Sequence, residues 1–504
     1  ACSLVEAFRR GERSPLEELD ATLGAIESSD LNAFSFLDPE RARAAARSAD
    51  VNLPFGGVPT GIKELESVAG WPSTEGSLVF RDRRAAVNST LVDRLLSDGG
   101  VVPVGLTTAS EFGGLNVSVT KLNGVTHNPW RHGRSTGGSS AGSAAAVAGG
   151  LVSLATGGDG GGSIRIPAAY TGLVGMKGTY GRIPRSPYAF SRPATVVLGC
   201  VARSVRDAAR FYDVCGGYHP GDPSSLPPAG VGAWEAGLGA NDLTGRRVAV
   251  LPTLGGVCKV ASSVDRRVRE AAQRLIGEAG MVEVDVNLNL PNLAAQWMMG
   301  NLSTLLAELG DRWPACAKDL TDEVASGLFA AQSLYNLRTA AVAEDLRLRA
   351  YAAMAALFEQ VDFVIAATNP DVAFAADAPT SATTDSFVDA IGSSRAGRAA
   401  MRGALAGVRL AAAAFPNLPS AILDATGRRL PDLVTMGALT IISNIYGNPA
   451  VTVPAGLVDG LPVGMQVLTR HHADALLFDV ALAAERIAPW PLVANTRSAR
   501  ALEV

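Results

Sequence analysis

Two glycine-rich stretches that both carry serine are the parts of the chain best suited to chemistry. The first, RSTGGSSAG, covers residues 134–142, and the second, GGDGGGS, covers residues 157–163. Glycine loses more conformational entropy on folding than any other residue, so such runs indicate a backbone shape that other residues cannot adopt. Because consecutive N–H groups of residues 160–162 can converge on a negative charge, the second run predicts an anion cradle directly before Ser163.

A serine attacks an amide or ester carbonyl only when a base takes its proton and hydrogen-bond donors stabilise the resulting oxyanion. We predict that the base is an unprotonated lysine, because arginine is the default cation of this chain and cannot lose its proton. Among the 44 Lys and Arg residues there are five lysines, which are Lys63, Lys121, Lys177, Lys259 and Lys318. Lys63 lies in the apolar, turn-rich segment LPFGGVPTGIKELESVAG, which would desolvate it, whereas Lys121 adjoins a polar loop.

Three other motifs match parts of this region less well. GSSAG at 138–142 has the spacing of a nucleophile elbow centred on Ser140, but that elbow follows a buried strand and NPWRHGRST is polar and turn-forming. SVTK at 118–121 fits the first motif of penicillin-recognising enzymes, yet the SDN element is missing. GGDGGGS lacks the lysine of a phosphate-binding loop. Acyl transfer by a serine without histidine remains as the prediction.

Three long stretches resemble, in order and spacing, the motif regions of the amidase signature family. They are GGVPTGIKELESVAGWPSTEGS, HNPWRHGRSTGGSSAGSAAAVAGG and GGDGGGSIRIPAAYTGLVGMKGTYGRIPRS. The resemblance is dense over residues 56–190 and returns more weakly at 447–485. It implies an α/β fold in which a single large mixed β-sheet is covered by helices on both faces.

The resemblance also implies a role for individual residues. Lys63 matches the base, Ser139 matches a bridging serine that follows a cis peptide bond, and Ser163 matches the nucleophile. The implied oxyanion hole consists of Gly160, Gly161 and Gly162. Residues implied to support the site are Asp159, Arg165 and Ser140.

The sequence departs from the family pattern at four positions. Glu64 follows the lysine where an aspartate is usual, and Gly158 replaces a threonine. Ala141 displaces the second glycine after the serine pair. Asn369 stands where a threonine is common, which we expect to reshape the substrate pocket.

The elements that must position these residues are predicted to form one domain over residues 1–504. Residues 1–50 have helical periodicity, and Ser14 followed by Pro15 predicts a helix start. The motif region at 56–190 precedes a variable substrate-pocket region at 190–440 and a core motif at 441–490. Within the variable region, RRVAVLP, SSVDRRVREAAQRLIGEAG and MVEVDV predict a β-α-β unit in which Ser263 caps the helix.

Composition excludes several classes of partner. Hydrophobic residues make up 47% and charged residues 18% of the chain, with a formal charge of −4. No polybasic surface for nucleic acid or membrane is predicted, and no apolar run reaches the length of a membrane span. The five cysteines and five histidines lack metal-ligand spacing. We expect a cytoplasmic monomer or homodimer that uses neither cofactor nor metal and whose partners are a small substrate and water.

The predicted activity is hydrolysis of a carboxylic amide, a carbamate or a related ester through an acyl-enzyme intermediate. Two alternatives stay open. One is the A subunit of a tRNA-dependent glutamine amidotransferase, and the other is a non-catalytic binding protein on the same fold. Trp297, Met298, Met299 and Cys316 are candidate pocket residues, as are Phe112, Tyr170 and Tyr446.

Overall fold

The fold is known from a computed structural model, which describes residues 1–187, 194–230, 233–378, 414–415, 417–418 and 437–494. Part of the variable region predicted at 190–440, including residues 379–413 and 419–436, therefore lies outside the described residues. At the centre is a mixed sheet of eleven strands. In spatial order they are β1 (Phe34–Leu37), β3 (Val102–Thr107), β2 (Pro59–Lys63), β8 (Leu154–Asp159), β10 (Val197–Ala202), β9 (Val174–Lys177), β14 (Ala450–Val458), β15 (Leu461–Thr469), β13 (Phe363–Ala367), β11 (Arg247–Val250) and β12 (Val282–Glu283).

The direction of the strands changes along the sheet. β2 runs parallel to both β3 and β8, and β11 runs parallel to β12 and β13. The strands between these two groups pair antiparallel, including the hairpin of β14 and β15. Two small ribbons lie apart from the main sheet, β4 (Val119–Thr120) with β5 (Gly124–Val125) and β6 (His127–Asn128) with β7 (Arg131–Ser135). The predicted mixed sheet is confirmed.

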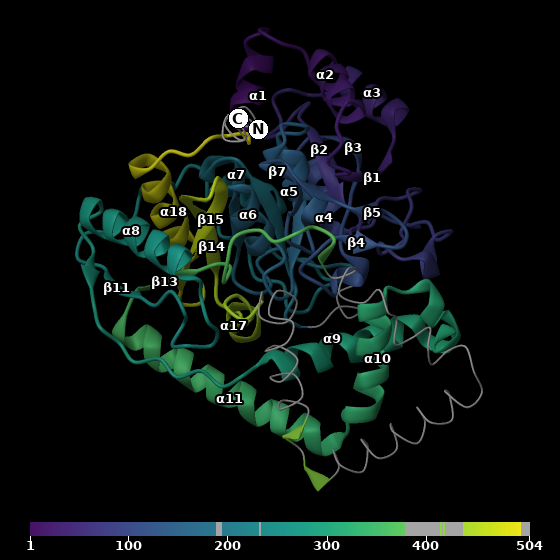
Figure 1. The fold of residues 1–504 in the computed structure, drawn as a ribbon. Helices are drawn as coiled ribbons and strands as arrows, with labels where there is room; N and C mark the ends of the chain where they lie inside the picture. Colours follow the sequence, from purple (N-terminus) through teal and green to yellow (C-terminus); the bar gives the residue numbers. More distant parts are fainter. Residues whose placement is uncertain (188–193, 231–232, 379–413, 416, 419–436, 495–504) are drawn as a thin grey trace.

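Helices cover both faces of this sheet. They are α1 (Cys2–Arg9), α2 (Pro15–Glu27), α3 (Pro39–Arg47), α4 (Thr90–Ser97), α5 (Ala141–Ala148), α6 (Arg165–Thr171), α7 (Val205–Cys215), α8 (Ser262–Glu278), α9 (Ala294–Leu309), α10 (Asp322–Leu334), α11 (Leu337–Gln360), α17 (Ile441–Tyr446) and α18 (Asp474–Ile487). Figure 1 shows α1, α2 and α3 at the top of the view and α9, α10 and α11 at the bottom. Short 3-10 turns are η1 (Leu78–Phe80), η2 (Glu111–Gly113), η3 (Gly310–Arg312) and η4 (Ala315–Asp319).

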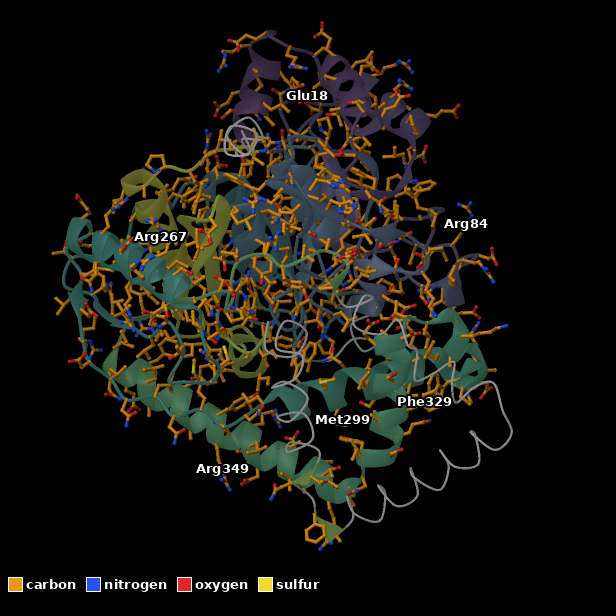
Figure 2. The ribbon with its side chains drawn as sticks, viewed as in Figure 1. Glu18, Arg84, Arg267, Met299, Phe329 and Arg349 are labelled. Carbon is orange, nitrogen blue, oxygen red and sulfur yellow. The ribbon has the colours of Figure 1, made fainter. Side chains whose placement is uncertain are left out.

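The core divides according to these layers. One cluster of buried side chains joins α4, α7, α8 and α18 to the sheet, and a second joins α2, α3 and α5 to it. A third cluster packs α9 and α10 against Phe80 and Phe112. Charged side chains such as Arg84 and Arg349 are exposed, whereas Met299 of α9 is buried (Figure 2).

Two helix starts test the predicted signals. Ser14 accepts a hydrogen bond from Glu17 N and forms a capping box at the start of α2, with Pro15 in the first position, as predicted. The prediction for Ser263 is wrong, because α8 begins one residue earlier at Ser262, with Ala261 as its N-cap and no side-chain cap. Ser263 therefore lies inside the first turn. The strand predicted from MVEVDV is also shorter, ending at Glu283 on the sheet edge.

Candidate active site

The site forms where two parallel strands end. β2 ends at Lys63 and its neighbour β8 ends at Asp159. Parallel strands bring their carboxyl ends to the same edge of a sheet, which is where ligands bind in many α/β proteins. Lys63 N donates to Thr156 Oγ1 over 2.8 Å, which ties the two strands together at this edge. The Lys63 side chain is 2% exposed and lies inside the protein.

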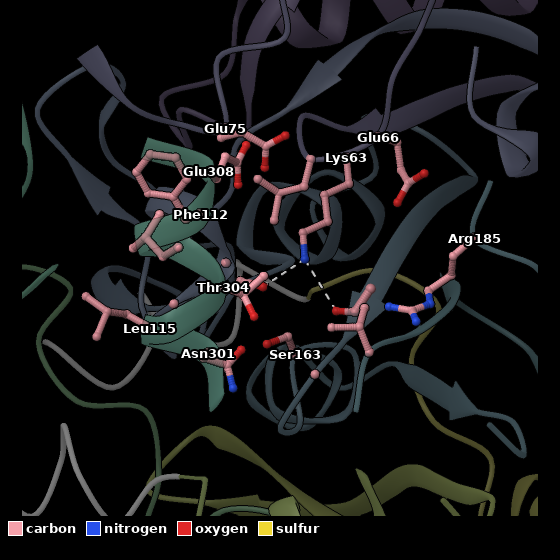
Figure 3. Close-up of a pocket in the computed structure, with 18 of the residues that line it drawn as sticks. Lys63, Glu66, Glu75, Phe112, Leu115, Ser163, Arg185, Asn301, Thr304 and Glu308 are labelled. Carbon is pink, nitrogen blue, oxygen red and sulfur yellow. Dashed lines mark hydrogen bonds between the residues drawn. The ribbon is translucent and has the colours of Figure 1, made fainter. Parts of the chain in front are cut away.

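The start of α5 presents two hydroxyls to this lysine. Lys63 Nζ lies 2.8 Å from Ser139 Oγ and 2.8 Å from Ser140 Oγ, and it donates to Gly158 O over 3.3 Å. Figure 3 shows the amine at the centre of the pocket. The peptide bond between Gly138 and Ser139 is cis, as the family resemblance implied. An uncharged Nζ in this place can accept a proton from either hydroxyl.

α5 approaches the sheet closely enough to bring these serines to the lysine. All eight of its residues are buried, and seven of them are glycine, serine or alanine. A Cβ atom on Gly142 would lie 2.3 Å from Thr108 N and 2.4 Å from Ala33 O. Packing therefore requires a glycine at 142, which explains a glycine after the serine pair without a nucleophile elbow.

Ser163 ends the second glycine run and lines the same cavity as Lys63 and Ser139. Its side chain is 5% exposed, and its carbonyl accepts a hydrogen bond from Ser140 N over 3.2 Å. Figure 3 shows Ser163 on the loop below the lysine amine. The structure thus brings the three predicted catalytic side chains to one cavity.

The glycine loop corrects one part of the predicted oxyanion hole. Gly162 N donates to Asp159 Oδ1 over 2.7 Å, so this N–H holds the loop and is not offered to a substrate. Gly162 has a φ of 129°, and a Cβ atom there would lie 2.2 Å from Thr440 Oγ1. Glycine is needed at 162 for backbone conformation and space. The N–H groups of Gly160, Gly161 and Ser163 remain the candidate donors.

A fully buried ion pair supports the loop from behind. Arg165 Nε and Nη2 donate to the two carboxylate oxygens of Asp159, each over 3.0 Å, and both side chains are 0% exposed. Burial alone would raise the pKa of the Asp159 carboxyl, but the Arg165 charge and several hydrogen bonds hold that pKa well below its usual range. Asp159 therefore stays ionised and continues to accept the hydrogen bond from Gly162 N.

Three residues of this network were missed by the sequence analysis. Asn444 Oδ1 accepts from Arg165 Nη2 over 2.7 Å, and Asn444 Nδ2 donates to Asp159 Oδ1 over 2.9 Å. Gln466 Oε1 accepts from Arg165 Nη1 over 3.2 Å, and Thr440 Oγ1 donates to Gly161 O over 2.5 Å. Of the three, Gln466 could have been found from the sequence, because an amide within the otherwise apolar segment LPVGMQVL indicates a buried hydrogen-bonding partner.

The cavity above the serines measures about 550 Å³. Its apolar walls include Phe112, Leu115, Trp297 and Met298. Charged side chains also line the cavity, and among them Arg83 contacts Glu75 and Glu308 at 3.3 and 3.4 Å. The charged lining residues besides Lys63 are Glu66, Glu75, Arg83, Arg84, Arg185, Glu308 and Glu323.

Several candidate pocket residues lie elsewhere. Met299 and Cys316 are buried and do not line the cavity, and Tyr170 packs in a separate core cluster. Asn369 is buried and donates to Ile166 O over 3.2 Å, so the expectation that it reshapes the pocket directly is wrong. Tyr446 does not line the cavity either.

Glu64, the unusual neighbour of Lys63, points away from the cavity. It accepts hydrogen bonds from Ala109 N over 2.5 Å and from Asn123 Nδ2 over 2.9 and 3.0 Å. Burial raises the pKa of this carboxyl to about 7. These hydrogen bonds join the turn after β2 to the segment after β3 and to the turn between β4 and β5.

A family model described as Amidase matches residues 17–400. The chain belongs to the amidase signature family. It is 32% identical over 526 aligned residues to the A subunit of a glutamyl-tRNA(Gln) amidotransferase from Salinispora tropica, covering 97% of this chain and 96% of that protein. It is 30% identical to an acylamidase of Rhodococcus erythropolis, covering 97% and 95%.

Solved structures of the family agree with the architecture. A bacterial aryl acylamidase superposes with a TM-score of 0.80 at 26% identity, covering 96% of this chain and 95% of that one. A 6-aminohexanoate cyclic dimer hydrolase superposes with a TM-score of 0.78 at 25% identity, covering 97% of both chains. The protein is an amidase-type hydrolase that acts on carbon–nitrogen bonds. In the described part of the chain, no helix is long and apolar enough to cross a membrane.

Proposed function

We propose that this amidase hydrolyses small carboxylic amides through an acyl-enzyme on Ser163, with carbamates and esters as related substrates. The observation that carries the proposal is the 2.8 Å contact between Lys63 Nζ and Ser139 Oγ in the cavity that Ser163 also lines. A buried lysine beside a hydroxyl can act as a base in its neutral form, a task that no histidine has to perform.

The proposed reaction has two steps, acylation of Ser163 and hydrolysis of the acyl-enzyme. Neutral Lys63 takes a proton from Ser139 as Ser139 takes the proton of Ser163, and Ser163 Oγ bonds to the carbonyl carbon. The relay then runs backwards and protonates the leaving nitrogen as the C–N bond breaks. Water attacks the acyl-enzyme with the same base and releases the acid. Backbone N–H groups of Gly160, Gly161 and Ser163 are the proposed donors to the oxyanion of both tetrahedral intermediates.

The shape of the cavity favours amides with an aryl or alkyl group. Phe112, Leu115 and Trp297 provide apolar surface beside Ser163, and about 550 Å³ suits a small organic molecule. The structural likeness to an aryl acylamidase agrees with this class. We therefore propose anilides and short alkyl amides as the first substrates to test.

The test is a hydrolysis screen of anilides, alkyl amides, carbamates and esters of graded size. We expect turnover of at least one amide class, none with Ser163→Ala, and a single covalent adduct at Ser163 after treatment with a fluorophosphonate. A wild-type protein that is folded but neither labelled at Ser163 nor active on any member would refute the proposal. It would also favour the binding-protein alternative.

The likeness to amidotransferase A subunits supports a second candidate, since it extends over 97% of the chain at 32% identity. A protein of this kind would hydrolyse glutamine as ammonia donor and would need partner subunits. Ammonia release from glutamine by the chain mixed with amidotransferase partner subunits, measured beside turnover of anilides by the chain alone, separates the two candidates. Activity confined to glutamine would support the amidotransferase role.

A further inference from the structure

The oxyanion loop is a short series of peptide planes, and each plane is held by a different part of the protein. A trans peptide is planar, and its C=O and N–H point in opposite directions. A hydrogen bond to the carbonyl of one residue therefore also sets the direction of the N–H of the next residue. By this rule, the contacts on the carbonyls of Gly160 and Gly162 set the directions of the candidate oxyanion donors at Gly161 and Ser163.

Two of the three planes are held by residues that lie beside the buried ion pair of Asp159 and Arg165. The carbonyl of Gly161 accepts from Thr440 Oγ1 over 2.5 Å, and the N–H of Gly162 in the same plane donates to Asp159. The carbonyl of Gly162 accepts from Ile166 N over 2.7 Å at the start of α6, which sets the N–H of Ser163. Both contacts come from segments beside the ion pair of Asp159 and Arg165.

The remaining plane, between Gly160 and Gly161, is held from the variable region. Trp297, in the first turn of α9, donates from Nε1 to Gly160 O over 2.7 Å. Its indole ring also lies against the next residue, because a Cβ atom on Gly161 would be 2.9 Å from Trp297 Cε2 and Cζ2. The same side chain lines the substrate cavity.

We propose that Trp297 is a positioning residue that orients the N–H of Gly161 toward the substrate oxyanion. Its hydrogen bond fixes the 160–161 plane, and its ring prevents that plane from rotating. α9 also forms a wall of the cavity. The Trp297 indole therefore couples the position of this helix to the geometry of the oxyanion hole. This inference rests on the proposed amide hydrolysis at Ser163.

The test replaces Trp297 with Phe, which keeps an aromatic ring and removes the N–H donor. We expect kcat to fall about tenfold, less than the 10²–10³ typical when a direct oxyanion donor is removed, because Trp297 acts through the Gly161 N–H. KM should stay within about twofold, because the variant weakens a hydrogen bond that forms to the oxyanion of the transition state and not to the bound substrate. A boronic acid that forms a tetrahedral adduct with serine should lose the same factor in affinity, whereas the carboxylic acid product should not.

Trp490→Phe is the matched control, because Trp490 Nε1 also donates to a backbone carbonyl, that of Arg203, over 3.0 Å, and Trp490 does not line the cavity. It should leave kcat and boronate affinity unchanged. If Trp297→Phe does not fold, benzothienylalanine at 297, with sulfur in place of the N–H, serves as the second variant.

A Trp297→Phe protein with wild-type kcat overturns the inference. So does one in which kcat, product affinity and Tm all fall together, because that pattern indicates a purely structural role. Fluorophosphonate labelling of the wild type keeps the two proposals apart. Labelled, active wild type with an unaffected Trp297→Phe variant refutes only the role of Trp297, whereas an unlabelled wild type refutes the proposed function.

Discussion

Lys63 is the residue on which the proposed chemistry depends most directly. Its amine contacts the hydroxyls of Ser139 and Ser140 and is almost wholly enclosed. We predict that Lys63→Met and Lys63→Arg each lower kcat by at least about 10³-fold, because methionine has no basic group and a guanidinium stays protonated. Initial rates on the best amide of the screen measure this effect.

Lys121→Arg is the matched control for this change. Lys121 is exposed, contacts Asp322 at 3.6 Å and lies outside the cavity, so its rate should equal that of the wild type. An active Lys63→Arg enzyme would mean that the base is another group.

Gly162 shows how backbone geometry limits the loop. Alanine there would have to adopt a φ of 129° and would clash with the Thr440 hydroxyl. We predict that Gly162→Ala lowers kcat by about 100-fold or more, since strain of roughly 1–2 kcal/mol from φ adds to overpacking of similar size beside the nucleophile. Gly245→Ala is the comparison, because Gly245 has a φ of 74° but nothing within 4 Å of the added Cβ. It should change stability slightly and kcat not at all, and equal loss in both variants would contradict this account.

At the scale of elements, the carboxyl end of β8 and the start of α6 are joined by the pair of Asp159 and Arg165. Both charges are fully buried, so removing one leaves the other without compensation. We predict that Arg165→Met lowers the free energy of unfolding by about 3–5 kcal/mol and abolishes activity. Urea denaturation measures the first effect.

The contrast is an ion pair at the surface. Arg206 contacts Glu6 and Glu235 and is 44% exposed, so Arg206→Met should cost less than about 1 kcal/mol. If the two variants lose similar free energies of unfolding, burial does not determine how much the pair of Arg165 and Asp159 contributes to stability.

Elements were predicted with uneven success, for identifiable reasons. The start of α2 was predictable because Ser14, Pro15 and Glu17 act on their immediate neighbours. The start of α8 was not, because adjacent serines at 262 and 263 are equally good caps, whereas the N-cap is Ala261, whose N–H donates to Pro370 O over 2.9 Å. The docking of Trp297 on the glycine loop, 137 residues away in sequence, left no local pattern to detect.

At the scale of the whole molecule, the buried Lys177 makes stability depend on pH. It lies on β9 near the centre of the sheet and donates to Asn448 O over 2.6 Å. Burial lowers its pKa to about 7, with the Arg165 charge acting in the same direction. Between about pH 7 and the ordinary lysine pKa of about 10.4, the unfolded chain binds a proton that the folded protein does not, so this group increases stability as pH rises.

We predict that the stability of the wild type relative to Lys177→Met increases by about 1–2 kcal/mol between pH 7.5 and 9. Urea denaturation of both proteins at the two pH values measures it, and other titrating groups contribute equally to both. A constant difference would show that Lys177 is charged in the folded protein.

The sequence by itself indicated the family and the mixed α/β class and singled out Lys63, Ser139 and Ser163, which the structure brings to one cavity, because these depend on residue types at fixed spacing. Only the tertiary structure decided which N–H groups of the loop are available, since the carboxylate of Asp159 accepts the hydrogen bond of Gly162 N. It also decided which residues support the site. Thr440, Asn444 and Trp297 reach the loop from segments more than 130 residues away, and contacts of that kind arise from packing against the sheet and not from any local sequence pattern.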